Sequence, residues 1–323
     1  MRIACLTHYY IEDNRAGGEL MIHALLKALA DAGHQVTAYI TDTAFADTVI
    51  DGVRVVYDVD VETILDSVDY DVVISQFQSA PHAMASAKRR GKPFVFVVHN
   101  DIWATLRVVR LLAARDLVLY NTEWIRALNT TQASEVVVHP PIDRKAFKTK
   151  TSGEYVSLVN LTIPKGVDIF FELARRMPDV KFLGVKGGYW KENQRSISLP
   201  NVTIIENTPN MRRDVYAKSK VVLMPSTYET FGMVAAEAIT SGIPVIASPT
   251  AGLKENLGDA GIYVRRGSND ADKWEAELRA LLTDAKYYAR ASRRALARSK
   301  VIDTATELKG FVRAVEGLID GKA

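Results

Sequence analysis

The sequence predicts an α/β fold made of two doubly wound domains, each a parallel sheet with helices on both faces. Short apolar runs alternate with helical patterns along the chain, which is typical of parallel strands joined by crossover helices. The chain has 323 residues, more than one hydrophobic core usually serves, so two domains of about 150 residues each are expected. The pattern restarts after the polar segment 148–154, which is the predicted linker.

The first predicted domain, residues 1–149, opens directly with a strand. Residues 18–32 follow it with the apolar spacing of an amphipathic helix, which is expected to end at Gly33 because glycine favours the left-handed conformation at helix ends. Strand patterns in this half lie at residues 2–8, 35–41, 53–57, 71–75, 93–98, 117–121 and 135–138.

The second predicted domain, residues 150–305, repeats the architecture. Its strand patterns lie at 155–161, 180–185, 202–206, 220–225, 243–248 and 261–264. Residues 271–318 are strongly helical, and the final segment, 306–323, is expected to pack back on the first domain. Two doubly wound domains facing each other place ligand sites after the carboxyl ends of their strands, in the cleft between them.

Composition narrows the class of protein. The chain is 48% hydrophobic and 24% charged, with a net charge of +3, which is compatible with anionic substrates but does not by itself indicate nucleic acid. Its one cysteine, Cys5, excludes an intrachain disulfide and indicates a reducing compartment. No signal-peptide pattern and no apolar run of about 18 residues is evident, so we expect a cytoplasmic protein for which peripheral membrane contact stays open.

The most informative segment is Tyr-Glu-Thr-Phe-Gly-Met-Val-Ala-Ala-Glu, residues 228–237. It follows the apolar run 221–225, which reads as a buried parallel strand, and Thr230 is the predicted N-cap of the next helix. Backbone N–H groups at a helix start stabilise an anion, and here they would come from Phe231, Gly232 and Met233.

The spacing of Glu229 and Glu237 excludes one role for them. Eight residues of helix rise about 12 Å, whereas acid and base carboxylates in glycoside hydrolysis lie about 5 to 9.5 Å apart. We therefore expect the two acids to contact different parts of one long ligand.

Further candidates follow other predicted strands. Gly17 and Gly18 stand at a helix start, but they do not form a G-x-G-x-x-G motif and no acidic residue ends the second strand in the dinucleotide pattern, which argues against NAD. His99 follows the fifth strand, where it would either bind a sugar hydroxyl, act at the reacting centre or cap the next helix. Lys165 follows a strand beside a glycine and is placed to neutralise a phosphate, and Lys186 lies in a similar glycine-rich loop.

Together these motifs resemble glycosyltransferase family 4, the retaining group with the two-domain GT-B fold. The resemblance spans nearly the whole chain, and its most specific part is the pair of glutamates spaced E-x7-E. The matching segments are Gly17–Gly18, His99, 140–147, 164–168, 211–217 and 229–237.

The resemblance implies a nucleoside-diphosphate sugar as donor. Glu229 would contact hydroxyls of the donor sugar, Glu237 would hold the ribose, and Lys165 would neutralise the diphosphate together with the backbone N–H groups of residues 231–233. Gly17 and Gly18 would approach the diphosphate from the other domain, with His99 near the sugar. Thr208 would border the nucleobase.

The chain departs from the family at Asn160, where an arginine usually pairs with the lysine on the diphosphate. One charge-assisted contact is therefore missing, and Lys186 or another cation is a candidate to substitute for it. The expected reaction is transfer with retention and without a metal, the acceptor proton passing to a phosphate oxygen while cations and amides stabilise the departing diphosphate. The catalytic residues expected from the resemblance are His99, Glu229 and Lys165.

Other interpretations remain open at the level of sequence. They are a different nucleotide-sugar enzyme such as a sugar 2-epimerase, a degenerate nucleotide-sugar-binding subunit, and a nucleic-acid module. The last would use the basic stretches 107–115 and 88–90, but interleaved aromatic residues are missing there. The acceptor is not defined by the sequence and could be a glycan, a lipid, a protein or a modified nucleic acid.

Overall fold

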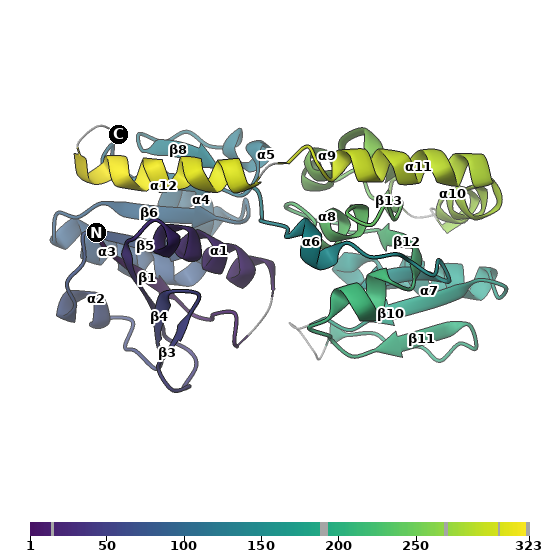
Figure 1. The fold of residues 1–323 in the computed structure, drawn as a ribbon, viewed down its shortest axis with the longest axis horizontal. Helices are drawn as coiled ribbons and strands as arrows, with labels where there is room; N and C mark the ends of the chain where they lie inside the picture. Colours follow the sequence, from purple (N-terminus) through teal and green to yellow (C-terminus); the bar gives the residue numbers. More distant parts are fainter. Residues whose placement is uncertain (14–15, 188–192, 268–270, 303, 321–323) are drawn as a thin grey trace. The chain divides into compact units, whose positions relative to one another are not determined.

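The computed structural model describes residues 1–13, 16–187, 193–267, 271–302 and 304–320. The chain divides into two compact units, Met1–Pro141 with Asp303–Ala323, and Ile142–Ile302. Each unit is a predominantly parallel sheet covered by helices (Figure 1), so the predicted α/β class with two doubly wound domains is confirmed.

The boundary between the two units lies after Pro141, before the polar segment 148–154 in the sequence. Asp143 caps the short helix α6 (Arg144–Phe147) by accepting hydrogen bonds from two backbone N–H groups, and α6 packs on elements of the second unit. The backbone of Ser152 and Glu154 then bonds to Ala217 and Lys218, so the polar segment runs along the second unit.

Unit 1 contains an eight-stranded sheet in the order β3-β4-β2-β1-β5-β6-β7-β8. All neighbouring pairs are parallel except β3 with β4. Its strands are β1 (Arg2–Thr7), β2 (Gln35–Ile40), β3 (Thr48–Ile50), β4 (Val53–Val56), β5 (Val72–Gln76), β6 (Phe94–Val98), β7 (Leu117–Tyr120) and β8 (Ser134–Val137). The sequence predicted seven of these strands, and β3 escaped prediction because its three residues show too short a pattern.

Helices cover both faces of this sheet. They are α1 (Gly17–Asp31), α2 (Ile64–Ser67), the 3₁₀ turn η1 (Phe77–Ser79), α3 (Ala80–Arg89), α4 (Trp103–Arg110), α5 (Glu123–Arg126) and α12 (Thr304–Asp320). The last of these, drawn in yellow in Figure 1, packs against α1, β7 and β8, which confirms that the C-terminal helix returns to the first unit.

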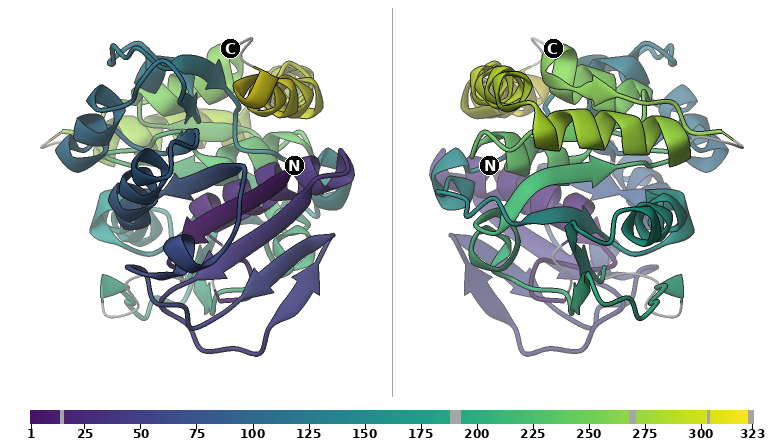
Figure 2. Two further views of the ribbon diagram at one scale, coloured as in Figure 1. Left: turned by 90° about the vertical axis from the view of Figure 1, so that its left-hand side faces the viewer. Right: turned by 90° about the vertical axis from the view of Figure 1, so that its right-hand side faces the viewer.

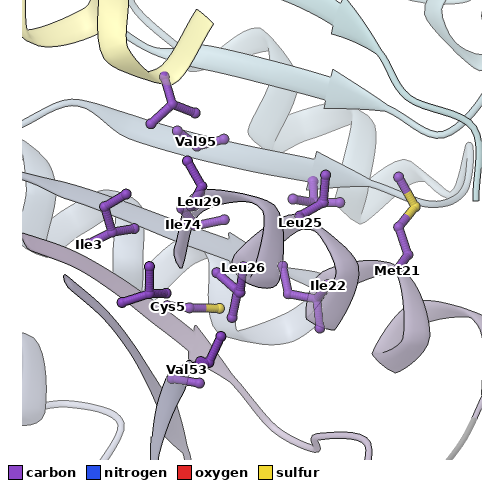
Figure 3. Packing of buried hydrophobic residues seen from close by; sticks show 14 of the residues in the cluster. Ile3, Cys5, Met21, Ile22, Leu25, Leu26, Leu29, Val53, Ile74 and Val95 are labelled. Carbon is purple, nitrogen blue, oxygen red and sulfur yellow. The ribbon is translucent and has the colours of Figure 1, made fainter. Parts of the chain in front are cut away.

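Successive side chains of each strand point to opposite faces of the sheet, so unit 1 has two hydrophobic cores, one on each face. Ile3 and Cys5 of β1 face α1, whose apolar stripe carries Leu25, Leu26 and Leu29 (Figure 3). Ala4 and Leu6 point to the opposite face, where α3 and α4 pack. A strand buried on both faces reads as a continuous apolar run, which is why the sequence shows these strands clearly.

Unit 2 contains a six-stranded parallel sheet in the order β11-β10-β9-β12-β13-β14. The strands are β9 (Tyr155–Val159), β10 (Lys181–Val185), β11 (Val202–Ile205), β12 (Ser219–Met224), β13 (Val245–Ala247) and β14 (Ile262–Tyr263), all at predicted positions.

The helical elements of unit 2 also lie on both faces of its sheet, as the side views in Figure 2 show. Helices α7 and α10 pack together on one face, and α8, α9 and η4 belong to the core of the other. Their bounds are η2 (Ile163–Lys165), α7 (Val167–Arg176), the π-helix η4 (Arg212–Tyr216), α8 (Met233–Ile239), α9 (Ala251–Leu257), η5 (Gly258–Ala260), α10 (Ala271–Thr283) and α11 (Ala285–Arg298). Within the described ranges, no helix combines the length and the apolar character needed to cross a membrane.

Candidate active site

The ends of two neighbouring strands in unit 2 bring together two of the predicted site residues. Lys165 ends the turn that follows β9, and Glu229 lies in the loop that follows β12. The Nζ atom of Lys165 lies 2.5 Å from Oε2 of Glu229, and the two side chains are 28% and 13% exposed. A half-buried ion pair therefore stands at the carboxyl edge of the sheet, where doubly wound folds bind ligands.

Close packing of the two loops positions this pair. Gly166 has a φ of 89°, and a Cβ there would lie 2.3 Å from Cγ of Pro225. Arg266 fastens the same loops, since Nη1 donates to the carbonyl oxygens of Pro225 at 3.0 Å and Ile163 at 3.1 Å while Nη2 holds both carboxylate oxygens of Asp168. Lysine could not form these bonds, because only the planar guanidinium offers several donors in fixed directions.

The loop before α8 is held by buried contacts from α9. Gly232 has a φ of 88°, and a Cβ there would lie 2.6 Å from Cδ2 of Leu253. The side chain of Asn256 donates to the carbonyl oxygens of Phe231 at 3.0 Å and of Gly232 at 2.9 Å. These bonds fix the peptides of the predicted phosphate-binding segment.

Helix α8 begins at Met233, and its N-cap is Gly232, which makes no side-chain capping bond. The prediction that Thr230 is the N-cap was therefore wrong. The left-handed conformation of Gly232 turns the chain sharply after the loop, so that the helix starts later than the threonine alone suggests.

Glu237 lies on α8 with its carboxylate buried against Tyr216 of the π-helix η4. The hydroxyl of Tyr216 donates to Oε2 of Glu237. Burial raises the pKa of Glu237 to about 7, and the bond from Tyr216 opposes that rise. Single π-helical turns occur often at functional sites. Here the turn carries the tyrosine that partners the second glutamate of the motif.

Asn160 occupies a backbone conformation that few residue types tolerate. Its φ is 70°, in the left-handed region that asparagine adopts more readily than most residues. Its Oδ1 accepts a hydrogen bond from Nε2 of Gln194 at 3.1 Å, while Oε1 of Gln194 accepts from the backbone N–H groups of Leu161 and Gly187. A Cβ on Gly187 would lie 2.7 Å from Cγ of Asn160, so the loops after β9 and β10 touch directly at this asparagine.

The remaining two candidates in unit 2 have polar partners. Lys186 pairs with Glu206, Nζ to Oε1 at 2.6 Å, on an exposed part of the surface. The hydroxyl of Thr208 donates to Oδ2 of Asp214 at 2.5 Å and accepts from the N–H of Asn210 at 3.0 Å. Arg213, and then Thr208, lower the pKa of Asp214 to about 2, so this carboxylate is ionised and holds the turn that leads into η4.

In unit 1, His99 follows β6 and is buried. Burial lowers its pKa to about 4, so the imidazole is neutral near pH 7. Its Nε2 lies 2.7 Å from Oε1 of Gln76, whose Nε2 donates to the hydroxyl of Thr7 at 3.0 Å. Because the amide of Gln76 is oriented by Thr7, its oxygen faces the histidine and accepts the Nε2 proton. Nδ1 then carries the lone pair and can accept a hydrogen bond.

An aromatic side chain and a glycine complete the surroundings of His99. Phe77 stacks on the imidazole with ring centroids 4.7 Å apart and has a φ of 49°, which is rare for an aromatic residue. A Cβ on Gly18 would lie 2.8 Å from Cε2 of Phe77, so a side chain at position 18 would have to displace this ring from its place on His99. Gly17 begins α1 directly beside it. Residues held in such backbone conformations often gather at functional sites.

The structure thus brings Lys165 to Glu229, Asn160 to the Lys186–Gly187 loop, and His99 to Gly18 through Phe77. The sequence analysis gave no role to five side chains that hold the predicted site residues or their loops: Gln76, Gln194, Tyr216, Asn256 and Arg266. Two of these had a positional signal, since Gln76 and Arg266 each stand just after a predicted strand. In the described part of the chain, histidine, cysteine, aspartate and glutamate side chains form no group of three suited to a metal ion.

A comparison with known protein families gives a match within the second unit. Residues 155–284 match the family described as glycosyl transferases, group 1. This segment of the chain belongs to that family. The group 1 match contains the Lys165–Glu229 pair, Gly232 and Glu237, and it lies wholly within unit 2.

Curated relatives resemble parts of the chain. O-antigen chain mannosyltransferase B of Escherichia coli is 36% identical over 86 residues, covering 27% of this chain. The D-inositol 3-phosphate glycosyltransferase of Nocardiopsis dassonvillei is 29% identical over 220 residues, covering 57% of this chain. The matches span 22% and 49% of the length of these two relatives.

Solved structures resemble the chain over almost its full length. Anabaena HepE in complex with UDP-glucose gives a TM-score of 0.80 at 17% identity, covering 98% of this chain and 100% of that one. Sucrose-phosphate synthase from Thermosynechococcus elongatus gives 0.79 at 15% identity, with 99% and 100% covered. These likenesses confirm the predicted GT-B fold class.

Proposed function

We propose that the protein is a retaining glycosyltransferase that moves a sugar from a nucleoside diphosphate to an acceptor without a metal ion. The observation that carries the proposal is the ion pair of Lys165 with Glu229 at the carboxyl edge of a group 1 sheet. The names of several relatives and neighbours point the same way, since they describe glycosyltransferases and a complex with UDP-glucose.

In this proposal Lys165 and the loop before α8 receive the diphosphate. The anion attracts the Lys165 ammonium away from Glu229, and the freed carboxylate then accepts hydrogen bonds from donor-sugar hydroxyls. The peptides of Phe231, Gly232 and Met233 add N–H donors. Because Arg266 and Asn256 fix these loops before the ligand arrives, little reorganisation opposes charge development on the leaving diphosphate.

The reaction breaks the bond between the anomeric carbon and a phosphate oxygen and forms a bond from that carbon to the acceptor oxygen. The acceptor proton passes to the phosphate oxygen that leaves. Lys165 stabilises the charge on that diphosphate, and the transfer occurs on the face that the leaving group vacates, which gives retention. No step requires a proton from His99, whose imidazole is neutral near pH 7 because burial lowers its pKa to about 4.

Glu237 has a different task at the nucleoside end. A carboxylate with a pKa of about 7 is half protonated near neutrality, and a ribose that donates two hydroxyl protons stabilises the ionised form. Nucleotide binding would therefore release a proton from Glu237.

Asn160 gives this chain a donor site with one cation fewer than the family pattern. Arginine at this position would have to adopt a φ of 70° and would displace the contact with Gln194. Reverting Asn160 to arginine is therefore expected to cost about 1–2 kcal/mol in backbone strain. We propose that Lys165 supplies the main positive charge, since its partner Glu229 belongs to the same proposed donor site, whereas Lys186 pairs with the exposed Glu206.

The test is a binding and turnover panel with UDP-, GDP-, ADP- and TDP-sugars, with and without EDTA. One nucleotide class should raise the midpoint of thermal unfolding regardless of EDTA, because a ligand that binds the folded state stabilises it. Slow hydrolysis of an α-linked donor should release the α-anomer, which is read by proton NMR immediately after release.

Matched lysine variants isolate the site. Lys165→Ala should weaken binding about 10- to 100-fold, the loss expected for one hydrogen bond to a charged group. Lys181→Ala is the control, because Lys181 also pairs with a glutamate, Glu154, but at the opposite end of a neighbouring strand. Binding without turnover on any acceptor would favour a degenerate binding subunit, and the absence of binding by all four nucleotide classes would refute the proposal.

A further inference from the structure

One helix of unit 1 exposes large apolar side chains among arginines. Trp103 is 71% exposed, Ile102 55% and Leu111 61%. Exposed arginines at 107, 110 and 115 lie on the same short segment. We call this surface the α4 face: Ile102, Trp103, Arg107, Arg110, Leu111 and Arg115.

The opposite side of α4 anchors the helix to the unit. Val108, Val109 and Leu112 are buried in the core on the face of the sheet that also carries Ala4 and Leu6. Thr105 is buried too, and its hydroxyl donates to Oδ1 of Asn100 at 2.7 Å. The helix cannot turn its apolar residues inward without giving up these contacts. The exposure of the α4 face is therefore built into the fold of unit 1.

The charge of the α4 face is uniformly positive. Among the residues that the structure describes, no carboxylate lies within 4.0 Å of Arg107, Arg110 or Arg115. The guanidinium of Arg107 lies 5.4 Å from the ring centre of Trp103, so the cation and the indole are presented together. Two acids flank this segment in the sequence: Asp101 is half-buried, and Asp116 is buried and accepts bonds from the N–H groups of Phe94 and Ala113.

We propose that the α4 face docks the protein on an anionic phospholipid surface. Tryptophan and leucine enter the boundary between headgroups and acyl chains, and arginine is attracted by anionic lipid, so the two kinds of side chain act together. Charge complementarity favours this occupant over an uncharged apolar partner, because the three arginines lie among the apolar residues and have no carboxylate partner in the described part of the chain. The inference does not depend on the proposed transfer reaction.

A second basic helix provides an internal comparison. Helix α11 carries Arg293 and Arg294 on its exposed side, with Leu296, which is 38% exposed, and without a tryptophan or isoleucine beside them. If positive charge alone caused membrane attachment, α11 would serve as well as α4.

The experiment is co-sedimentation of the full chain with vesicles of phosphatidylcholine alone or with about one quarter phosphatidylglycerol. We expect binding only to the anionic vesicles, weakening as sodium chloride rises, because salt screens the arginines. The double variant Trp103→Ser, Leu111→Ser and the triple variant Arg107→Gln, Arg110→Gln, Arg115→Gln should each lower the partition coefficient at least tenfold. Unchanged unfolding midpoints show that both variants fold, since all five side chains are exposed.

The control variant is Arg293→Gln, Arg294→Gln on α11, which should bind vesicles as the wild type does. If this control lost as much vesicle binding as the α4 variants, positive charge anywhere on the surface would explain the binding, and the proposal would be overturned. Equal binding to both vesicle types, or vesicle binding that survives both α4 variants, would overturn it as well. Self-association or binding of single-stranded DNA that is lost in the Trp103 double variant, with no vesicle binding, would assign the face to another partner and also overturn it.

Discussion

Replacing Glu237 with glutamine should make the folded chain more stable at neutral pH while leaving its stability at low pH nearly unchanged. The pKa of Glu237 is about 7 in the folded chain against 4.5 for the free side chain. Between these values the folded state holds a proton that the unfolded state has lost. Stability therefore falls as pH rises through this window, and it changes no further above it.

The size of the effect follows from the two pKa values. They differ by about 2.5, and each pKa unit corresponds to about 1.36 kcal/mol, so the ionisable side chain costs about 3 kcal/mol of stability above pH 7. Glutamine keeps an oxygen that accepts the bond from Tyr216 and has no proton to lose in this range. The variant should therefore avoid this cost.

The assay is urea unfolding of wild type and Glu237→Gln at several pH values from 4.5 to 8. The difference between the two free energies of unfolding should grow by about 3 kcal/mol across this range, in favour of the variant. Glu154→Gln, at an exposed glutamate, is the matched control and should follow the wild type. A difference that stays constant with pH would show that Glu237 is ionised in the folded chain already at pH 4.5, and would refute the argument from burial.

Three further changes probe the loops and the histidine. Gly232→Ala would set a Cβ 2.6 Å from Leu253 at a positive φ, so urea unfolding should show a loss of about 1–3 kcal/mol, and full stability would contradict the packing described. Gln76→Glu should raise the pKa of His99 from about 4 toward its usual value near 6.5, because a carboxylate would replace an amide 2.7 Å away; a ¹⁵N NMR titration that stays near 4 would count against this contact. Arg266→Gln should lower the free energy of unfolding by about 2 kcal/mol and increase proteolysis of the loops that follow β9 and β12. An unchanged cleavage pattern would mean that other contacts hold these loops.

Much of the fold could be predicted from the sequence because parallel strands buried on both faces appear as apolar runs. The runs at 94–98 and 219–224 are examples, and both lie where the sequence placed them. The three-residue strand β3 lacked such a run, so no pattern could show it.

The sequence by itself determined the alternation of strands and helices along the chain and a set of polar residues at strand ends, whereas the packing of the last helix on the first unit was an expectation that the structure confirmed. These features depend on local periodicity and on the connection rules of α/β folds. It could also name Lys165 and Glu229 as candidates, although 64 residues separate them in the chain.

Only the tertiary structure decided how those candidates are used. The left-handed backbone at Asn160, the bond from Tyr216 to Glu237, and the orientation of Gln76 toward His99 all arise from groups distant in sequence. Burial and hydrogen bonding set a pKa and a tautomer, and both depend on which side chains the packed sheets bring together. No local pattern carries that information, because the partners are chosen by the fold as a whole.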